Sequence, residues 1–149
     1  MGRYIGGPDV TTLHNLQARI DWLRAGPPPD RAGQTWINVV VRRSRDRAVI
    51  GRVEATVHTD WAELAWVLGP QHWGQGYGTE AAGWLIDHLA QSYGVTELWA
   101  TVDPGNTASI RIVQRWGFVH QEPQYRRTPE SFDEGDLVFA RGLREDHLP

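Results

Sequence analysis

The stretch from Trp66 to Ala81 decides how the rest of the chain is organised. It has the sequence Trp66-Val67-Leu68-Gly69-Pro70-Gln71-His72-Trp73-Gly74-Gln75-Gly76-Tyr77-Gly78-Thr79-Glu80-Ala81. An apolar run ending at Gly-Pro, three alternating glycines and a helix-forming segment predict a strand, a tight turn and a helix N-terminus. Glycines let an anionic group approach the main chain closely, and the unpaired N–H groups of a helix N-terminus attract it. The pattern therefore predicts an anion site, usually for phosphate.

The spacing excludes two common phosphate-binding loops. Gly74, Gly76 and Gly78 alternate, whereas the dinucleotide-binding fingerprint needs two residues between its second and third glycines. The acidic residue about 20 positions further on, Glu97, opens a predicted strand instead of closing one, so the expected ribose contact is missing. A Walker loop needs a lysine, and the chain contains none.

Two motifs carry a resemblance to a known family. Gln71-His72-Trp73-Gly74-Gln75-Gly76 resembles the acetyl-CoA pyrophosphate loop of the GNAT N-acetyltransferase superfamily, written Gln/Arg-x-x-Gly-x-Gly/Ala. Downstream, Asn106-Thr107-Ala108-Ser109 followed by Gly117-Phe118 is similar to the family's Asn-x-x-Ser…Gly-Phe segment. The residues around the glycine loop resemble the branch that contains the ribosomal-protein N-terminal acetyltransferases. The resemblance extends over residues 34–141.

The resemblance implies an α+β GNAT fold, in which helices flank a twisted, mixed and mostly antiparallel sheet. Its two central parallel strands would be Ala62–Leu68 and Val95–Val102, and they would splay apart at their ends. The residue pattern agrees, because β-rich runs at 34–43, 49–58 and 62–68 with short polar connections predict an antiparallel meander. Runs at 119–126 and 136–141 predict a further antiparallel pair.

Three helices are expected, from Thr11 or Thr12 to Arg24, from about Gly76 to Tyr93 and from about Thr107 to Trp116. Trp36, Trp84 and Trp99 fit a core at strand and helix spacing. Family members open with a full strand, and only residues 3–5 could supply it here, so we expect the N-terminal strand to be missing. It is lost, replaced by a strand of another chain, or encoded upstream. The strand edge left exposed favours a homodimer.

Composition limits the class of protein. The chain has 149 residues and a formal charge of −3, which predicts one domain, residues 1–149, and no nucleic-acid partner. It contains no signal segment or membrane-length apolar run, so a cytoplasmic protein without a membrane partner is the default expectation. It has no cysteine, and its histidines are not spaced as a metal set, so no metal site is expected.

The resemblance also implies a set of cofactor-binding residues. The pantetheine arm of acetyl-CoA would pair with the main chain around Trp66 to Leu68, and the N–H of Val67 or a neighbour would polarise the thioester oxygen. The pyrophosphate would sit on N–H groups from Gln71 to Thr79. The full expected set is Trp66, Val67, Leu68, Gln71, Gly74, Gln75, Gly76, Tyr77, Gly78, Thr79, Asn106 and Ser109.

The catalytic residues follow from what amine acetylation needs. Only a neutral amine attacks a thioester, so a base must remove a proton, and the departing thiolate needs a donor. Glu63 is the first choice for the base, directly or through a water, and Asp103 is the second. Ser109 is the candidate donor to the sulfur, or alternatively a first-turn helix serine. Asn106 either holds the pantetheine amides or caps its helix.

The expected function is acetyl-CoA-dependent N-acetyltransfer to a primary amine, either a protein N-terminus or a small molecule. Without a cysteine nucleophile, the acetyl group should pass directly from the thioester to the acceptor. One alternative is a catalytically degenerate module of the same fold that binds CoA as a sensor. Another is a nucleotide- or phosphate-binding module that uses the same loop.

Overall fold

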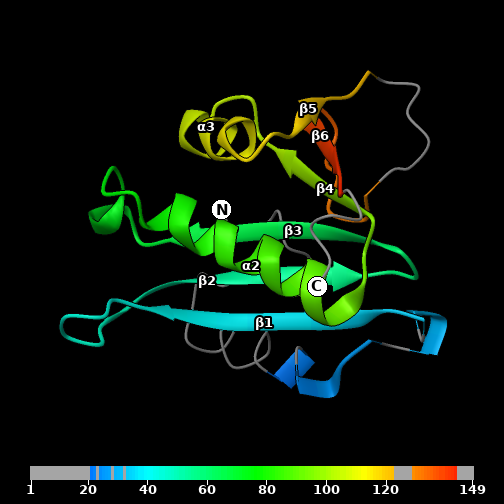
Figure 1. The fold of residues 1–149 in the computed structure, drawn as a ribbon, viewed down its shortest axis with the longest axis horizontal. Coiled ribbons are helices and arrows are strands. Elements are labelled where there is room, and N and C mark those ends of the chain that lie inside the picture. The colour runs from blue at the N-terminus through cyan, green and yellow to red at the C-terminus, as the bar shows by residue number, and fades with distance from the viewer. Residues whose placement is uncertain (1–20, 23, 28, 32, 123–128, 144–149) are drawn as a thin grey trace.

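The computed structural model describes residues 21–22, 24–27, 29–31, 33–122 and 129–143. Its sheet has six strands in the order β1-β2-β3-β4-β6-β5, so the predicted mixed α+β architecture is confirmed (Figure 1). No described helix is long and apolar enough to span a lipid bilayer. In chain order the elements are η2 (Pro29–Arg31), β1 (Thr35–Arg42), β2 (Val49–Val57), β3 (Trp61–Leu68), η3 (Pro70–His72), α2 (Tyr77–Tyr93), β4 (Glu97–Val102), α3 (Thr107–Arg115), β5 (Val119–His120) and β6 (Leu137–Gly142).

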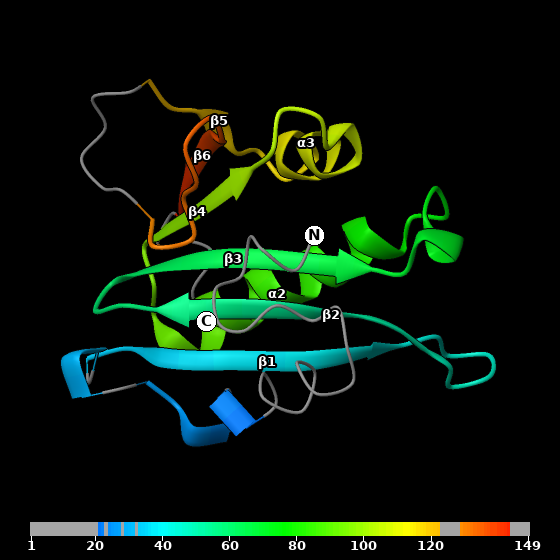
Figure 2. The ribbon, with the colours of Figure 1, turned by 180° about the vertical axis from the view of Figure 1, so that it is seen from behind.

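The sheet divides into two halves between β3 and β4. These strands run parallel, and they pair at three positions that end at Glu63 and Trp99. Beyond that point β3 continues to pair with β2, and β4 continues to pair with β6, but the two strands no longer pair with each other. Figures 1 and 2 show the β1–β2–β3 half and the β4–β6–β5 half diverging. The predicted splay of the central parallel strands is confirmed.

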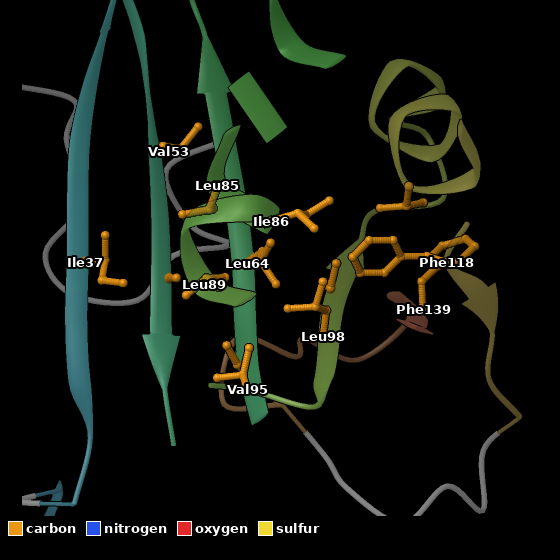
Figure 3. Close-up of a cluster of buried hydrophobic side chains, with 14 of the residues drawn as sticks. Ile37, Val53, Leu64, Leu85, Ile86, Leu89, Val95, Leu98, Phe118 and Phe139 are labelled. Atoms are coloured by element: carbon orange, nitrogen blue, oxygen red, sulfur yellow. The ribbon is translucent and has the colours of Figure 1, made fainter. Parts of the chain in front are cut away.

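One hydrophobic core on the α2 face of the sheet joins the two halves. Alternate residues of β2 and β3, among them Val53 and Leu64, are buried beneath Leu85 and Leu89 of α2 (Figure 3). The same cluster continues to β4, β6 and the segment after α3. Its members there include Leu98, Ala100, Phe118 and Phe139. Helix α2 therefore holds both halves together without closing the gap between β3 and β4.

Several predicted elements differ from the structure. Strand β4 starts at Glu97, although Val95 before it is fully buried. The first of the last two predicted strands is only Val119–His120, and residues 123–128 lie outside the described residues. Of the predicted N-terminal helix, residues 21, 22 and 24 are helical, and residue 25 continues it by one position. The rest of this helix lies outside the described part of the chain, as do residues 3–5.

The three tryptophans predicted for the core have different environments. Trp99 is buried as predicted, and Trp36 is half-buried. Trp84 is 48% exposed, so its core prediction was wrong. It lies on the outer face of α2 and stacks on His88, with ring centroids 4.9 Å apart.

Strand β3 approaches β2 closely because residue 51 has no side chain. A Cβ on Gly51 would overlap the Val67 carbonyl oxygen and lie 2.9 Å from the Leu68 Cα. Both atoms belong to the backbone of β3, so relief would require a shift of the strand.

We therefore predict that Gly51→Ala lowers the free energy of unfolding by about 1–3 kcal/mol, the usual cost of overpacking. The matched control is Gly142→Ala, because a Cβ on that strand glycine would meet nothing within 4 Å. Urea denaturation of both variants provides the measurement. Equal unfolding midpoints for the two variants would contradict the prediction.

Candidate active site

The glycine loop adopts the open turn that its sequence predicts. Gly74 and Gly76 have φ values of +74° and +85°, a left-handed conformation that favours glycine. Gly76 is the N-cap residue of α2, so the first N–H groups of this helix are directed toward the loop. A Cβ on either glycine would meet no atom within 4 Å. The loop thus leaves open space above its main chain, as an anion cradle requires.

The third glycine of the motif, Gly78, has a different role, because it allows close packing of α3 against α2. A Cβ on Gly78 would lie 2.9 Å from the Ile112 Cδ1, and one on Gly83 would lie 2.5 Å from the Trp116 ring. The Trp116 indole N–H also donates to the Thr79 carbonyl oxygen over 2.9 Å. These contacts bring α3 close to the N-terminal half of α2, so the two sequence motifs meet in space.

A cavity of about 250 Å³ lies where the two motifs meet. Its walls come from the end of β3, the glycine loop, the first turn of α2 and one side of α3. The lining residues are Trp66, Leu68, His72, Trp73, Gly74, Gly76, Tyr77, Gly78, Thr79, Asn106, Ala108, Ser109, Arg111, Ile112 and Arg115. Two of them, Arg111 and Arg115, are exposed cations four residues apart on one helix.

Most of the predicted cofactor-binding residues line this cavity, but three do not. Gln71 and Gln75 are exposed, and the Gln75 side-chain amide donates to the Gln71 carbonyl oxygen over 3.4 Å, a contact within the loop. Val67 lines a smaller adjoining cleft instead. Sequence reasoning missed Arg111 and Arg115, although their helical spacing after Ser109 was a signal for a basic face.

The adjoining cleft, of about 30 Å³, is the gap between the diverging strands. Residues 64–67 of β3 and 100–103 at the end of β4 line it, together with Asn106 and Ser109 at the N-terminus of α3. The Trp66 indole N–H donates to the Ser109 Oγ over 3.3 Å, and the Asn106 Oδ1 accepts from the Ser109 N–H over 3.1 Å. Asn106 therefore caps α3, one of its two predicted roles.

Strand register decides which β3 amides face the cleft. The His58 N–H donates to the Trp61 carbonyl, and the Gly69 N–H donates to the Ile50 carbonyl, over 2.8 and 2.9 Å. Because main-chain groups alternate in direction along a strand, odd-numbered residues of β3 face β2 and even-numbered ones face β4. The Val67 amide, the first choice for polarising the thioester oxygen, thus points away from the cleft. The amides of Trp66 and Leu68 point toward it.

Comparison with known proteins identifies the family of this site. The family model for the acetyltransferase (GNAT) domain matches residues 1–119. This chain belongs to the GNAT acetyltransferase family. The family resemblance predicted from the two motifs is therefore confirmed, and acetyl transfer is the general activity of the family.

Individual relatives agree with this assignment. An uncharacterised N-acetyltransferase, p20 of Bacillus licheniformis, is 39% identical over 57 residues, which cover 38% of this chain and 32% of the relative. The chain matches less than half the length of the curated relatives. A putative ribosomal-protein-serine acetyltransferase from Vibrio cholerae shares the fold with a TM-score of 0.63 and 21% identity, covering 87% of this chain and 72% of that one. Campylobacter jejuni N-acetyltransferase PseH, solved with acetyl coenzyme A, gives a TM-score of 0.65 at 16% identity, covering 90% and 84%.

The two candidate bases of this GNAT domain differ in their surroundings. Glu63 is only 5% exposed, and its two carboxylate oxygens contact different partners. Its Oε2 lies 2.7 Å from the His58 Nε2, and its Oε1 accepts from the Ser131 N–H and Oγ over 3.1 and 3.2 Å. Asp103 lines the cleft, and its Oδ1 accepts from the Gly105 N–H over 2.7 Å within the turn before α3.

A further cavity, of about 260 Å³, lies beside Tyr77, which also lines the cavity above the glycine loop. Its walls include Arg43 at the start of the β1–β2 turn and Trp84 of α2. The Arg43 side chain and the Ala48 N–H donate hydrogen bonds to the Asp46 carboxylate, which holds the pKa of Asp46 well below its usual range. Arg43 is thus committed to this turn.

We predict that Glu63→Ala destabilises the fold by about 1–3 kcal/mol, because the Ser131 donors and His58 lose a buried acceptor. Glu134→Ala, at an exposed position of the same β5–β6 connection, serves as the control and should change stability by less than about 0.5 kcal/mol. Thermal unfolding followed by circular dichroism measures both. An unfolding temperature for Glu63→Ala equal to that of the control would show that the buried contacts contribute nothing.

Proposed function

We propose that this GNAT domain is an N-acetyltransferase that uses acetyl-CoA and transfers the acetyl group directly to a primary amine. The observation that carries the proposal is that two adjoining cavities share three lining residues. Trp66, Asn106 and Ser109 line both the space above the glycine loop and the cleft between the strands. A ligand with a diphosphate at one end and an acyl thioester at the other matches this shape.

The glycine loop and α3 would hold the phosphates. Gly74 and Gly76 leave their main chain open, and the N-terminus of α2 supplies N–H groups and a positive dipole end. Arg111 and Arg115, on the facing wall of the cavity, add positive charge that pairs with phosphate oxygens. The structure of PseH with acetyl coenzyme A, a protein of the same fold, supports this choice of cosubstrate.

The reaction would take place where β3 and β4 part. Acetyl-CoA supplies the thioester, and the amides of Trp66 and Leu68 face the cleft as an added strand would require. One of these N–H groups would polarise the thioester oxygen. Ser109, held by its helix cap and by Trp66, would donate a proton to the departing sulfur.

Removal of a proton from the amine falls to a carboxylate. We assign this role to Glu63, at the point where the strands diverge, and keep Asp103, which lines the cleft directly, as the second candidate. The acceptor belongs to the class of primary amines, a protein N-terminus or a small molecule. A ribosomal-protein acetyltransferase among the proteins of similar fold supports the former.

We predict that Gly76→Asp abolishes acetyl-CoA binding, because the carboxylate places negative charge and bulk on the phosphate seat. Gly26→Asp is the matched control, since Gly26 also has a positive φ of +73° and open space around it. Isothermal titration calorimetry and ligand-induced thermal stabilisation give the readouts. If Gly76→Asp keeps the affinity of the unchanged chain, the loop is not the phosphate seat.

We predict that Ser109→Ala lowers kcat by roughly 10–100-fold and leaves acetyl-CoA affinity nearly unchanged. The measurement is release of free CoA thiol with a panel of amines, and the control is Ser44→Ala at an exposed turn position. An unaltered kcat would remove Ser109 from the mechanism. A chain that binds acetyl-CoA but releases no thiol with any amine would instead be a CoA-binding module without catalysis.

A further inference from the structure

A chain of side-chain hydrogen bonds leads from the cleft to the surface on the sheet face opposite α2. The Thr101 Oγ1 lies 3.0 Å from the Ser131 Oγ, which donates to the Glu63 Oε1 over 3.2 Å. The other Glu63 oxygen lies 2.7 Å from the His58 Nε2. Four side chains are thereby linked in series, two from strands β3 and β4 and two from the β2–β3 and β5–β6 connections.

The two ends of this chain have different environments. Thr101 lines the cleft between β3 and β4, together with Trp66 and Ser109, where the acceptor amine must meet the thioester. At the other end, the His58 side chain is 16% exposed, against 6% for Glu63. Glu63 does not line the cleft cavity. A buried carboxylate that does not reach the reacting atoms directly needs intervening groups to act as their base.

The hydrogen-bond directions at Ser131 allow a proton to pass from Thr101 to Glu63. Ser131 uses its hydroxyl proton toward Glu63, so the lone pairs of its Oγ are available to accept from Thr101. The Ser131 N–H also donates to the same Glu63 oxygen, which fixes the loop on the carboxylate. The Ser131 carbonyl oxygen lies 3.4 Å from the Thr101 Oγ1 and keeps the threonine beside the loop.

We propose that Thr101 and Ser131 relay the proton of the acceptor amine to Glu63, an inference that rests on the proposed acetyltransferase function. An N–H bond of the substrate ammonium breaks, its electron pair stays on nitrogen, and the proton joins the Thr101 Oγ1. The Thr101 hydroxyl proton passes to the Ser131 Oγ, and the Ser131 proton passes to the Glu63 carboxylate. Each hydroxyl ends with one proton, as it began, and Glu63 becomes a neutral acid. His58 takes this proton and returns it to solvent at the exposed end.

In this arrangement Thr101 is the residue that touches the acceptor, whereas Ser131 and His58 act through other groups. The amine is then neutral when it attacks the thioester carbon, and the C–N bond forms as the C–S bond breaks. The remaining surplus proton on nitrogen then passes to the Ser109 Oγ and replaces the proton that Ser109 gave to the thiolate. The relay therefore serves the acceptor side of the cleft, separately from the cofactor side.

The experiment compares Thr101→Val, Ser131→Ala and the double variant in the full chain, with Thr101→Ser as the conservative replacement. Thr96→Val is the matched control, because that hydroxyl donates to the Asp60 carbonyl at an exposed position outside the cleft. Steady-state thiol release gives kcat and KM, and thermal stabilisation by acetyl-CoA gives cofactor binding. Hydrogen exchange of the Ser131 amide reports, in the free protein, whether the loop stays on Glu63.

We expect Thr101→Val to lower kcat roughly 10–100-fold with unchanged acetyl-CoA binding and unchanged Ser131 protection, and Thr101→Ser to restore the rate. Because the two hydroxyls act in series, the double variant should lose no more than the larger single loss. A normal kcat for Thr101→Val, or multiplicative losses in the double variant, would overturn the relay while leaving the acetyltransferase proposal intact. Absence of thiol release by the unchanged chain would overturn both.

Discussion

The early end of the pairing between β3 and β4 is the constraint on which the rest of the structure depends. Each strand keeps its outer partner along its length, β2 for β3 and β6 for β4, so neither is left unsupported when the two separate after Glu63 and Trp99. Helix α2 and its buried leucines join the halves from one face. The fold can therefore keep an open cleft at its centre while one buried cluster joins the two halves of the sheet.

The close contact of α2 with α3 adds the second half of the site to this cleft. Gly78 and Gly83 allow Ile112 and Trp116 to approach, and the Trp116 indole ties the two helices through the Thr79 carbonyl. The N-terminus of α3, with Ser109, is thereby held at the mouth of the cleft beside Trp66. The glycine-rich segment thus has two structural roles. Gly74 and Gly76 leave the space above the loop open, whereas Gly78 allows α3 to pack closely against α2.

Local sequence patterns predicted most of this architecture. Two local predictions followed from the order of residue types along the chain and from the conformations that those residues favour. They are the strand, glycine turn and helix at residues 66–81 and the helix cap at Asn106. Contacts between residues far apart in the sequence could not be predicted from such local patterns. That Ser131 meets Glu63, 68 positions away in the sequence, depends on how the β5–β6 connection folds back. The direction of the Val67 amide depends on register with β2, and a shift by one residue would reverse it. The wrong prediction for Trp84 has a similar cause. Helical spacing alone did not distinguish the buried face of α2 from the exposed face on which Trp84 lies.

The cleft also carries an energetic consequence for the backbone of β3. Main-chain groups that face away from a pairing strand require other partners or solvent. The Leu68 carbonyl, which faces the cleft, accepts from the Trp73 indole over 3.0 Å, and this side chain belongs to the glycine loop itself. The loop therefore supplies to β3 one of the contacts that a neighbouring strand would otherwise make. An extended ligand with amide groups would complete the same edge, which is why a splayed sheet, more than any single side chain, suits this chain to a long thioester.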